Sequence, residues 1–144
     1  MPQMLVSPAA LPVCRSVAEP TPFGISLRDG GPDAAWVRVV GDLDIATAPR
    51  LAQMLRSAEL CARRLVLDLR QLTFIDCCGV HVIVNASIRA RQAGRRLVIV
   101  RGPSQADRVF VLTDTAAALE IIDLSLVEPP AQALVQIARS DHAA

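Results

Sequence analysis

The sequence predicts a single α/β domain with a mainly parallel sheet of about five strands packed against about four helices. Short apolar runs such as LVIV at 97–100 alternate along the chain with segments whose apolar residues recur at helical spacing. Strands that alternate with helices of this length are typical of parallel sheets covered by helices. The chain has 144 residues, of which 52% are hydrophobic, enough for one domain with a sizeable core.

The two ends of the chain are predicted to lie outside this domain. Residues 1–22 hold five of the ten prolines and show neither helical nor strand periodicity, so we expect a flexible tail. The domain itself is predicted at 23–140, and residues 141–144 form a short C-terminal tail.

The first elements of the domain are a hairpin and a helix. Residues 24–29 and 35–40 alternate apolar and polar side chains on either side of the turn residues DGGPD. The next helix is predicted within 45–60, because Thr47 is suited to cap it and Pro49 falls in its first turn, where a missing N–H costs little.

The remaining elements follow from the same signals. We expect strands at 64–69, 97–100 and 119–124. Helices are expected from Gly79 to Gly94 and at 129–140, and a further helix is expected to begin after Ser104, which caps it. Trp36, on the second strand, is expected in the core.

Composition excludes several classes of function. The net charge of +1 gives no strong basic field for nucleic acid, and no stretch approaches the ~20 apolar residues of a membrane span. Neither Lys nor Arg precedes the apolar N-terminal residues, and prolines interrupt them, so we predict no export signal. A cytoplasmic location is therefore expected. No glycine-rich phosphate loop is present, and we expect no cofactor.

Two loops are the predicted location of function. GDLD at 41–44 precedes the first helix, and DCCG at 76–79 precedes the second. In an open α/β sheet, ligands and partners meet the carboxyl ends of strands and the N-termini of the helices that follow.

The adjacent cysteines Cys77 and Cys78 invite three chemical interpretations. A catalytic thiol is disfavoured, because His81 lies one turn into the same helix and His142 in a tail, which leaves no obvious general base. Zinc is disfavoured because its cysteine ligands are usually two or more residues apart, and no metal is expected. A redox role through Cys61 with Cys77 or Cys78 stays open. The simplest interpretation of Cys78 is a small apolar residue beneath the start of a helix.

The outer face of the second helix has two interpretations. His81 and Asn85 are four residues apart, away from the apolar stripe, and form either a solvated surface or a partner-binding one. Val82, an apolar residue on the same side, favours the partner.

Three motifs together resemble the STAS domain family, in particular its bacterial anti-sigma factor antagonists. They are GDLD, the LVLDL-x₄-FIDxxG block at 65–79, and AGRRLVIV at 93–100. The similarity runs from about Gly24 to Asp123 and implies a single STAS-like α/β domain.

The resemblance implies a protein-binding module rather than an enzyme. Members of this type bind an anti-sigma factor, commonly a kinase of the histidine-kinase-like ATPase fold, and so influence sigma-factor-dependent transcription. The kinase phosphorylates a serine directly after the FID aspartate, and the added charge breaks the complex. Here that position is Cys77, so the serine switch is expected to be absent. The expected partner-binding residues are Asp42, Asp44, Thr47, Asp76, Cys77, Cys78, Gly79, His81, Val82 and Asn85.

Two other interpretations remain. The chain is alternatively a STAS subunit of a transporter-associated or signalling-scaffold complex without a sigma-factor connection. Thiol-based redox control through Cys61, Cys77 and Cys78 is compatible with either function.

Overall fold

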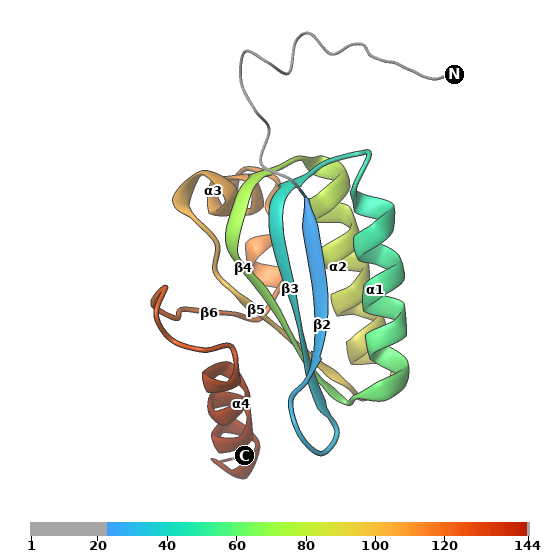
Figure 1. Ribbon diagram of the computed structural model, residues 1–144, viewed down its shortest axis with the longest axis vertical. Helices are drawn as coiled ribbons and strands as arrows, with labels where there is room; N and C mark the ends of the chain where they lie inside the picture. Colours follow the sequence, from blue (N-terminus) through green and yellow to red (C-terminus); the bar gives the residue numbers. More distant parts are fainter. Residues whose placement is uncertain (1–22, 144) are drawn as a thin grey trace, which may run out of the picture.

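The computed structural model describes residues 23–143, so the predicted tail at 1–22 lies outside the described residues. Within this range the strands form one sheet in the order β2-β3-β4-β5-β6 (Figure 1). They are β2 (Gly24–Asp29), β3 (Ala34–Leu43), β4 (Arg64–Ile75), β5 (Arg96–Val100) and β6 (Ile121–Ile122). Only the β2–β3 pair is antiparallel among these strands. The five-stranded, mainly parallel sheet confirms the predicted fold class.

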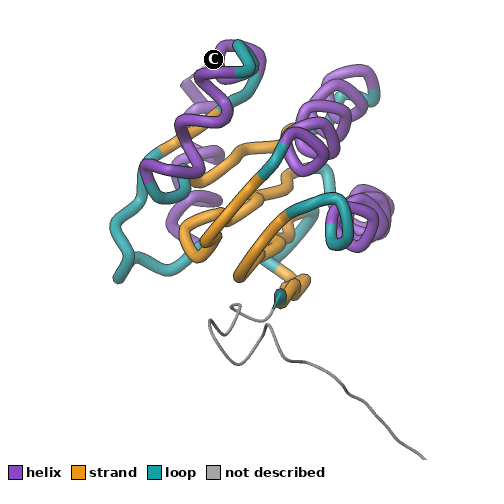
Figure 2. Tube along the Cα trace, turned by 90° about the horizontal axis from the view of Figure 1, so that it is seen from above, coloured by secondary structure: helices purple, strands orange, loops and turns teal. Residues whose placement is uncertain are grey.

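Helices cover both faces of the sheet. They are α1 (Ala48–Cys61), α2 (Cys77–Gln92), α3 (Ser104–Leu112) and α4 (Ala131–Ala143), with a 3-10 turn at Ala116–Ala118. The larger core joins one sheet face to α1, α2 and the buried residues of α3, whereas Ala133 and Ile137 of α4 form a smaller core on the other face. Figure 2 shows the sheet between α4 and the α1–α2 pair. Among the helices of residues 23–143, none has the length and apolar character needed to cross a membrane.

Several element boundaries differ from those predicted. β3 begins one residue earlier and ends three residues later, so the first three residues of GDLD are strand. β4 continues six residues past Leu69, because this polar stretch still pairs with the end of β3, as in the Val40–Gln71 pair. The last strand shrinks to Ile121–Ile122, and α4 extends to Ala143.

The predicted helix caps fare unevenly. Thr47 is the N-cap of α1 and Pro49 lies at its start, as expected, although the Thr47 side chain makes no capping bond. The Ser104 cap is wrong: Pro103 precedes α3, and its carbonyl accepts the N–H groups of Ala106 and Asp107. Trp36 is only half-buried, and packs against the smaller core.

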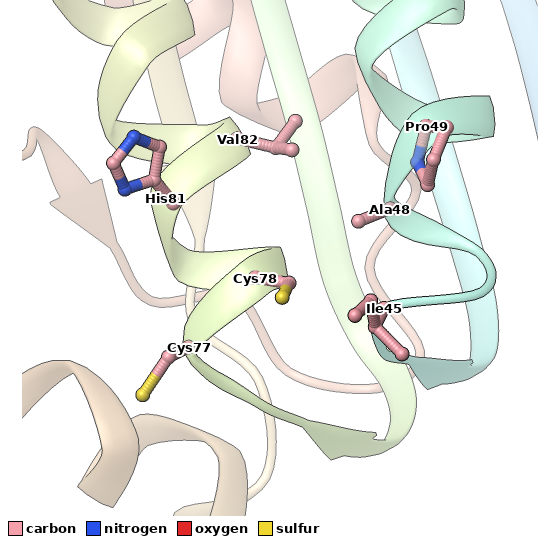
Figure 3. A pocket seen from close by; sticks show the side chains of 7 residues that line it. All are labelled: Ile45, Ala48, Pro49, Cys77, Cys78, His81 and Val82. Carbon is pink, nitrogen blue, oxygen red and sulfur yellow. The ribbon is translucent and has the colours of Figure 1, made fainter.

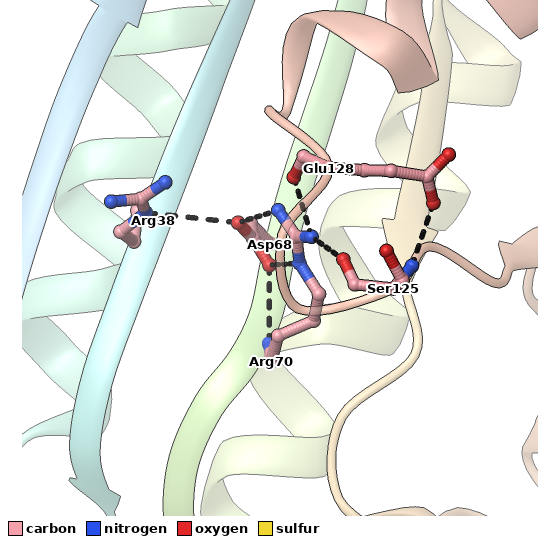
Figure 4. A network of polar contacts seen from close by, with 5 residues as sticks. All are labelled: Arg38, Asp68, Arg70, Ser125 and Glu128. Carbon is pink, nitrogen blue, oxygen red and sulfur yellow. Dashed lines mark hydrogen bonds and ion pairs between the residues drawn. The ribbon is translucent and has the colours of Figure 1, made fainter.

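A buried ion pair holds the loop before α4 against the sheet (Figure 4). The side chains of Asp68 and Arg70 on β4 are 2% and 6% exposed, and their closest N–O distance is 2.9 Å. Arg70 Nη1 also donates to the carbonyl oxygens of Ser125 and of Glu128, the latter at 2.7 Å. The hydrogen bond with Asp68 raises the pKa of Arg70 above its ordinary value against the opposing effect of burial, so the guanidinium stays charged.

Candidate functional site

The two predicted loops lie side by side. The backbone N–H of Asp76, just before α2, donates to the carbonyl oxygen of Leu43 at the end of β3 at 3.1 Å. Because Leu43 directly precedes Asp44, this bond brings the starts of α1 and α2 to the same edge of the sheet. The structure therefore joins the two loops that the sequence placed at strand ends.

The acidic residues of the first loop are engaged in local hydrogen bonds. Asp42 Oδ1 accepts from Thr73 Oγ1 of β4 at 2.5 Å, which ties the ends of the two strands together. Asp44 Oδ1 accepts the backbone N–H groups of Ala46 and Thr47 at 3.0 and 3.1 Å. Thr47 Oγ1 donates to the Asp42 carbonyl at 2.8 Å and accepts from the Asp44 N–H at 2.9 Å. These side chains fix the loop conformation, and their charge remains at the edge of the site.

Asp76 is the N-cap of α2. Its Oδ1 accepts the N–H groups of Cys78 and Gly79 at 2.9 and 3.1 Å, which satisfies two donors of the first helical turn. Gly79 faces inward: a Cβ there would lie 2.7 Å from Leu43 Cγ and 2.9 Å from Ile75 Cγ1. The absence of a side chain at Gly79 thus lets α2 begin directly against the ends of β3 and β4.

An apolar hollow lies between the starts of the two helices (Figure 3). We call it the α1–α2 hollow; its volume is ≈ 470 Å³, and it is lined by Ile45, Ala48, Pro49, Cys77, Cys78, His81 and Val82. Cys78 and Val82 point toward α1, while Cys77 and His81 point away from it. Ile45 is 73% exposed and adds a large aliphatic side chain to the lining of the hollow.

The cysteines occupy different environments. Cys77 is exposed and Cys78 is half-buried at the hollow, while Cys61 is exposed at the last residue of α1. α1 has 14 residues, so at about 1.5 Å per residue its ends lie about 20 Å apart. A disulfide requires Cα atoms within about 7 Å, so Cys61 cannot reach Cys77 or Cys78 in one chain.

The histidine and the thiols of the site form no hydrogen-bonded pair or metal-binding group among the described residues. No hydrogen bond connects His81 to a thiol within residues 23–143, although His81 follows Cys77 by one turn on the same side of α2. In the same range no group of three or more His, Cys, Asp or Glu side chains is arranged to hold a metal ion. The arrangement offers an apolar contact surface bordered by acidic loops.

Four of the residues that line the hollow, Cys77, Cys78, His81 and Val82, are among the partner-binding residues predicted from the sequence. Asn85, predicted to take part, is exposed on α2 but lies outside the lining of the hollow. Ile45, Ala48 and Pro49 were missed. Ile45 was missed because it lies outside the apolar stripe of α1. The signal that could have indicated it is an aliphatic residue between the end of a strand and the start of a helix.

Comparison with known proteins identifies the family. The family model of the STAS domain matches residues 29–128, which include both loops, α1, α2 and the strands that carry them. The chain belongs to the STAS domain family. The match confirms the resemblance drawn from GDLD, the FIDxxG block and AGRRLVIV.

Within this family, the STAS domain described here is similar to anti-sigma factor antagonists. It is 27% identical over 107 residues to the anti-sigma-B factor antagonist of Listeria monocytogenes, covering 74% of this chain and 91% of the relative. Its fold matches the unphosphorylated anti-sigma factor antagonist SpoIIAA with a TM-score of 0.66 and 13% identity, covering 81% and 97% of the two chains. An anti-sigma factor antagonist from Mycobacterium paratuberculosis matches with a TM-score of 0.63 and 19% identity, covering 80% and 95%.

Proposed function

We propose that this STAS domain binds an anti-sigma factor through the α1–α2 hollow and the acidic loops beside it. The observation that carries the proposal is the apolar hollow itself, which exposes Ile45 and half-exposes Cys78 at the point where α1 and α2 begin. An exposed apolar surface bordered by polar groups is typical of a protein interaction site. The module acts in the cytoplasm, has no catalytic activity of its own, and influences sigma-factor-dependent transcription by occupying its partner.

The partner we propose is an anti-sigma factor of the histidine-kinase-like ATPase fold. The similarity to an anti-sigma-B factor antagonist supports an anti-sigma factor as partner. The STAS resemblance adds that a kinase of this fold acts at the position after the Asp76 cap. Cys77 stands there and carries a thiol instead of a hydroxyl. Binding is therefore not ended by serine phosphorylation, and the module either stays competent or is controlled in another way.

A pair of matched substitutions, one just before α1 and one near its last residue, tests the surface. Ile45→Asp places a charge in the hollow, whereas Leu60→Asp places the same charge at the opposite end of α1, on a side chain that is 85% exposed. We expect Ile45→Asp to weaken binding to the purified anti-sigma factor by at least about tenfold, which corresponds to about 1.4 kcal/mol, and Leu60→Asp to leave it unchanged.

Both variants replace an exposed aliphatic side chain by a carboxylate. A difference in binding between them therefore depends on where the charge is placed. Equal binding by both variants would contradict the proposed surface. Capture of a transporter-associated ATPase or a scaffold protein by the wild-type domain, in place of an anti-sigma factor, would favour the alternative STAS function instead.

A further inference from the structure

The described chain begins beside the first turn of α1, whose other side lines the α1–α2 hollow. β2 runs antiparallel to β3, and Gly24 pairs with Val40, near the end of β3 that carries the acidic loop. The guanidinium of Arg50 lies 4.8 Å from the centre of the Phe23 ring. Arg50 directly follows Pro49, which lines the hollow. Residues 1–22 therefore join the domain at the edge of the candidate site.

The sequence of this N-terminal segment is suited to an apolar surface. It contains only two charged side chains, Arg15 and Glu19, and supplies apolar ones in MLV at 4–6 and in LPV at 11–13. Its five prolines favour extended backbone, which presents side chains to a groove at a low entropy cost. This composition matches a hollow whose inner lining includes Ile45 and Val82.

The length of the segment permits contact with the hollow. Leu11 precedes Phe23 by 12 residues, which span about 20 Å as a flexible chain and about 37 Å when fully extended as a proline-rich one. A tether of this length holds a segment near the hollow at an effective concentration of about 1 mM, so that even weak apolar contacts are populated. Covering the exposed Ile45 side chain supplies a favourable contact.

We propose that the N-terminal segment around Leu5 and Leu11 of the same chain occupies the α1–α2 hollow. The contact forms without any partner. A consequence that rests on the proposed function is that the anti-sigma factor must displace the segment before it binds.

Thiol alkylation measures this contact in the full chain, with no partner present. The half-buried Cys78 and the adjacent Cys77 report on the hollow, while the exposed Cys61 at the other end of α1 is an internal reference. Trypsin separates them, because Arg70 and Arg89 bound the peptide with the pair, and Arg56 and Arg63 bound the one with Cys61. The measured quantity is the alkylation rate of the Cys77–Cys78 pair divided by that of Cys61.

The variant Leu5→Asp/Leu11→Asp is compared with Ser7→Asp/Ser16→Asp, which adds the same charge to polar positions of the segment. We expect the rate ratio to rise at least about twofold in the leucine variant and to stay unchanged in the serine variant. An unchanged ratio in the leucine variant overturns the proposal. A wild-type rate ratio that rises when the protein is diluted also overturns the proposal, because the hollow would then be covered by a second copy of the chain. No outcome depends on the anti-sigma factor, so failure here leaves the proposed function to its own test.

Discussion

Substitution of Gly79 by alanine sets two effects of opposite sign against each other. Alanine is favoured over glycine in a helix by about 1 kcal/mol. The new Cβ, however, would lie 2.7 Å from Leu43 Cγ, where carbon atoms normally approach to about 3.5–4.0 Å. Leu43 is fully buried and Ile75 is 2% exposed, so neither has free space into which to move. Overpacking of this kind costs about 1–3 kcal/mol.

Subtracting the gain in helix propensity from the overpacking cost leaves about 0–2 kcal/mol. We expect Gly79→Ala to destabilise the domain by about 1–2 kcal/mol, in the upper half of this range, because the new Cβ meets the branch point of Leu43. At about 4 °C per kcal/mol, the Tm falls by about 4–8 °C. Differential scanning calorimetry measures the change. The control is Asn85→Ala on the exposed face of α2, which is expected to stabilise by about 0.5 kcal/mol. A Tm for Gly79→Ala at or above the wild-type value would refute the steric reasoning.

Two further predictions concern the buried ion pair and the switch position. Arg70→Met leaves the buried Asp68 carboxylate with the backbone N–H of residue 70 at 3.1 Å and Arg38 Nε at 3.7 Å, but without the guanidinium that pairs with it. The loss is expected to cost about 3 kcal/mol in urea unfolding. The double variant Asp68→Leu/Arg70→Met should recover a large part of this loss, and an equal loss in both variants would contradict the account. Cys77→Ser, incubated with the partner kinase and ATP, is expected to gain one phosphate at residue 77 by mass spectrometry, whereas the wild-type chain gains none there.

The order of strands and helices was predictable because each element has its own periodicity. The end of β4 was not, since Arg70, Gln71 and Thr73 interrupt the apolar run that marks its first half. These residues stay extended because long-range pairing with β3 holds them there, and pairing partners are not visible in a local pattern. The bond between Arg70 and the loop at Ser125 spans 55 residues and left no local signal either.

The site was predictable as a pair of loops but not as a surface. The carboxyl ends of parallel strands share one edge of a sheet, and this rule predicted that GDLD and DCCG lie together, as they do. It could not show that the Asp42 carboxylate accepts a hydrogen bond from Thr73, or that the Asp44 carboxylate accepts hydrogen bonds from the backbone of its own loop. Nor could it show that Ile45 faces Cys78 across the hollow, because this depends on how α1 and α2 pack.

The structure also places the two adjacent cysteines in different environments. Successive residues of a helix point about 100° apart, so Cys77 is exposed while Cys78 turns toward α1. The cap by Asp76 uses the N–H groups of Cys78 and Gly79 and makes no demand on the Cys77 side chain. The fold therefore accepts serine at position 77 as readily as cysteine. Cys77→Ser accordingly tests the chemistry of the partner alone, whereas Cys78→Ser would also place a hydroxyl in the hollow beside Val82 and Ile45.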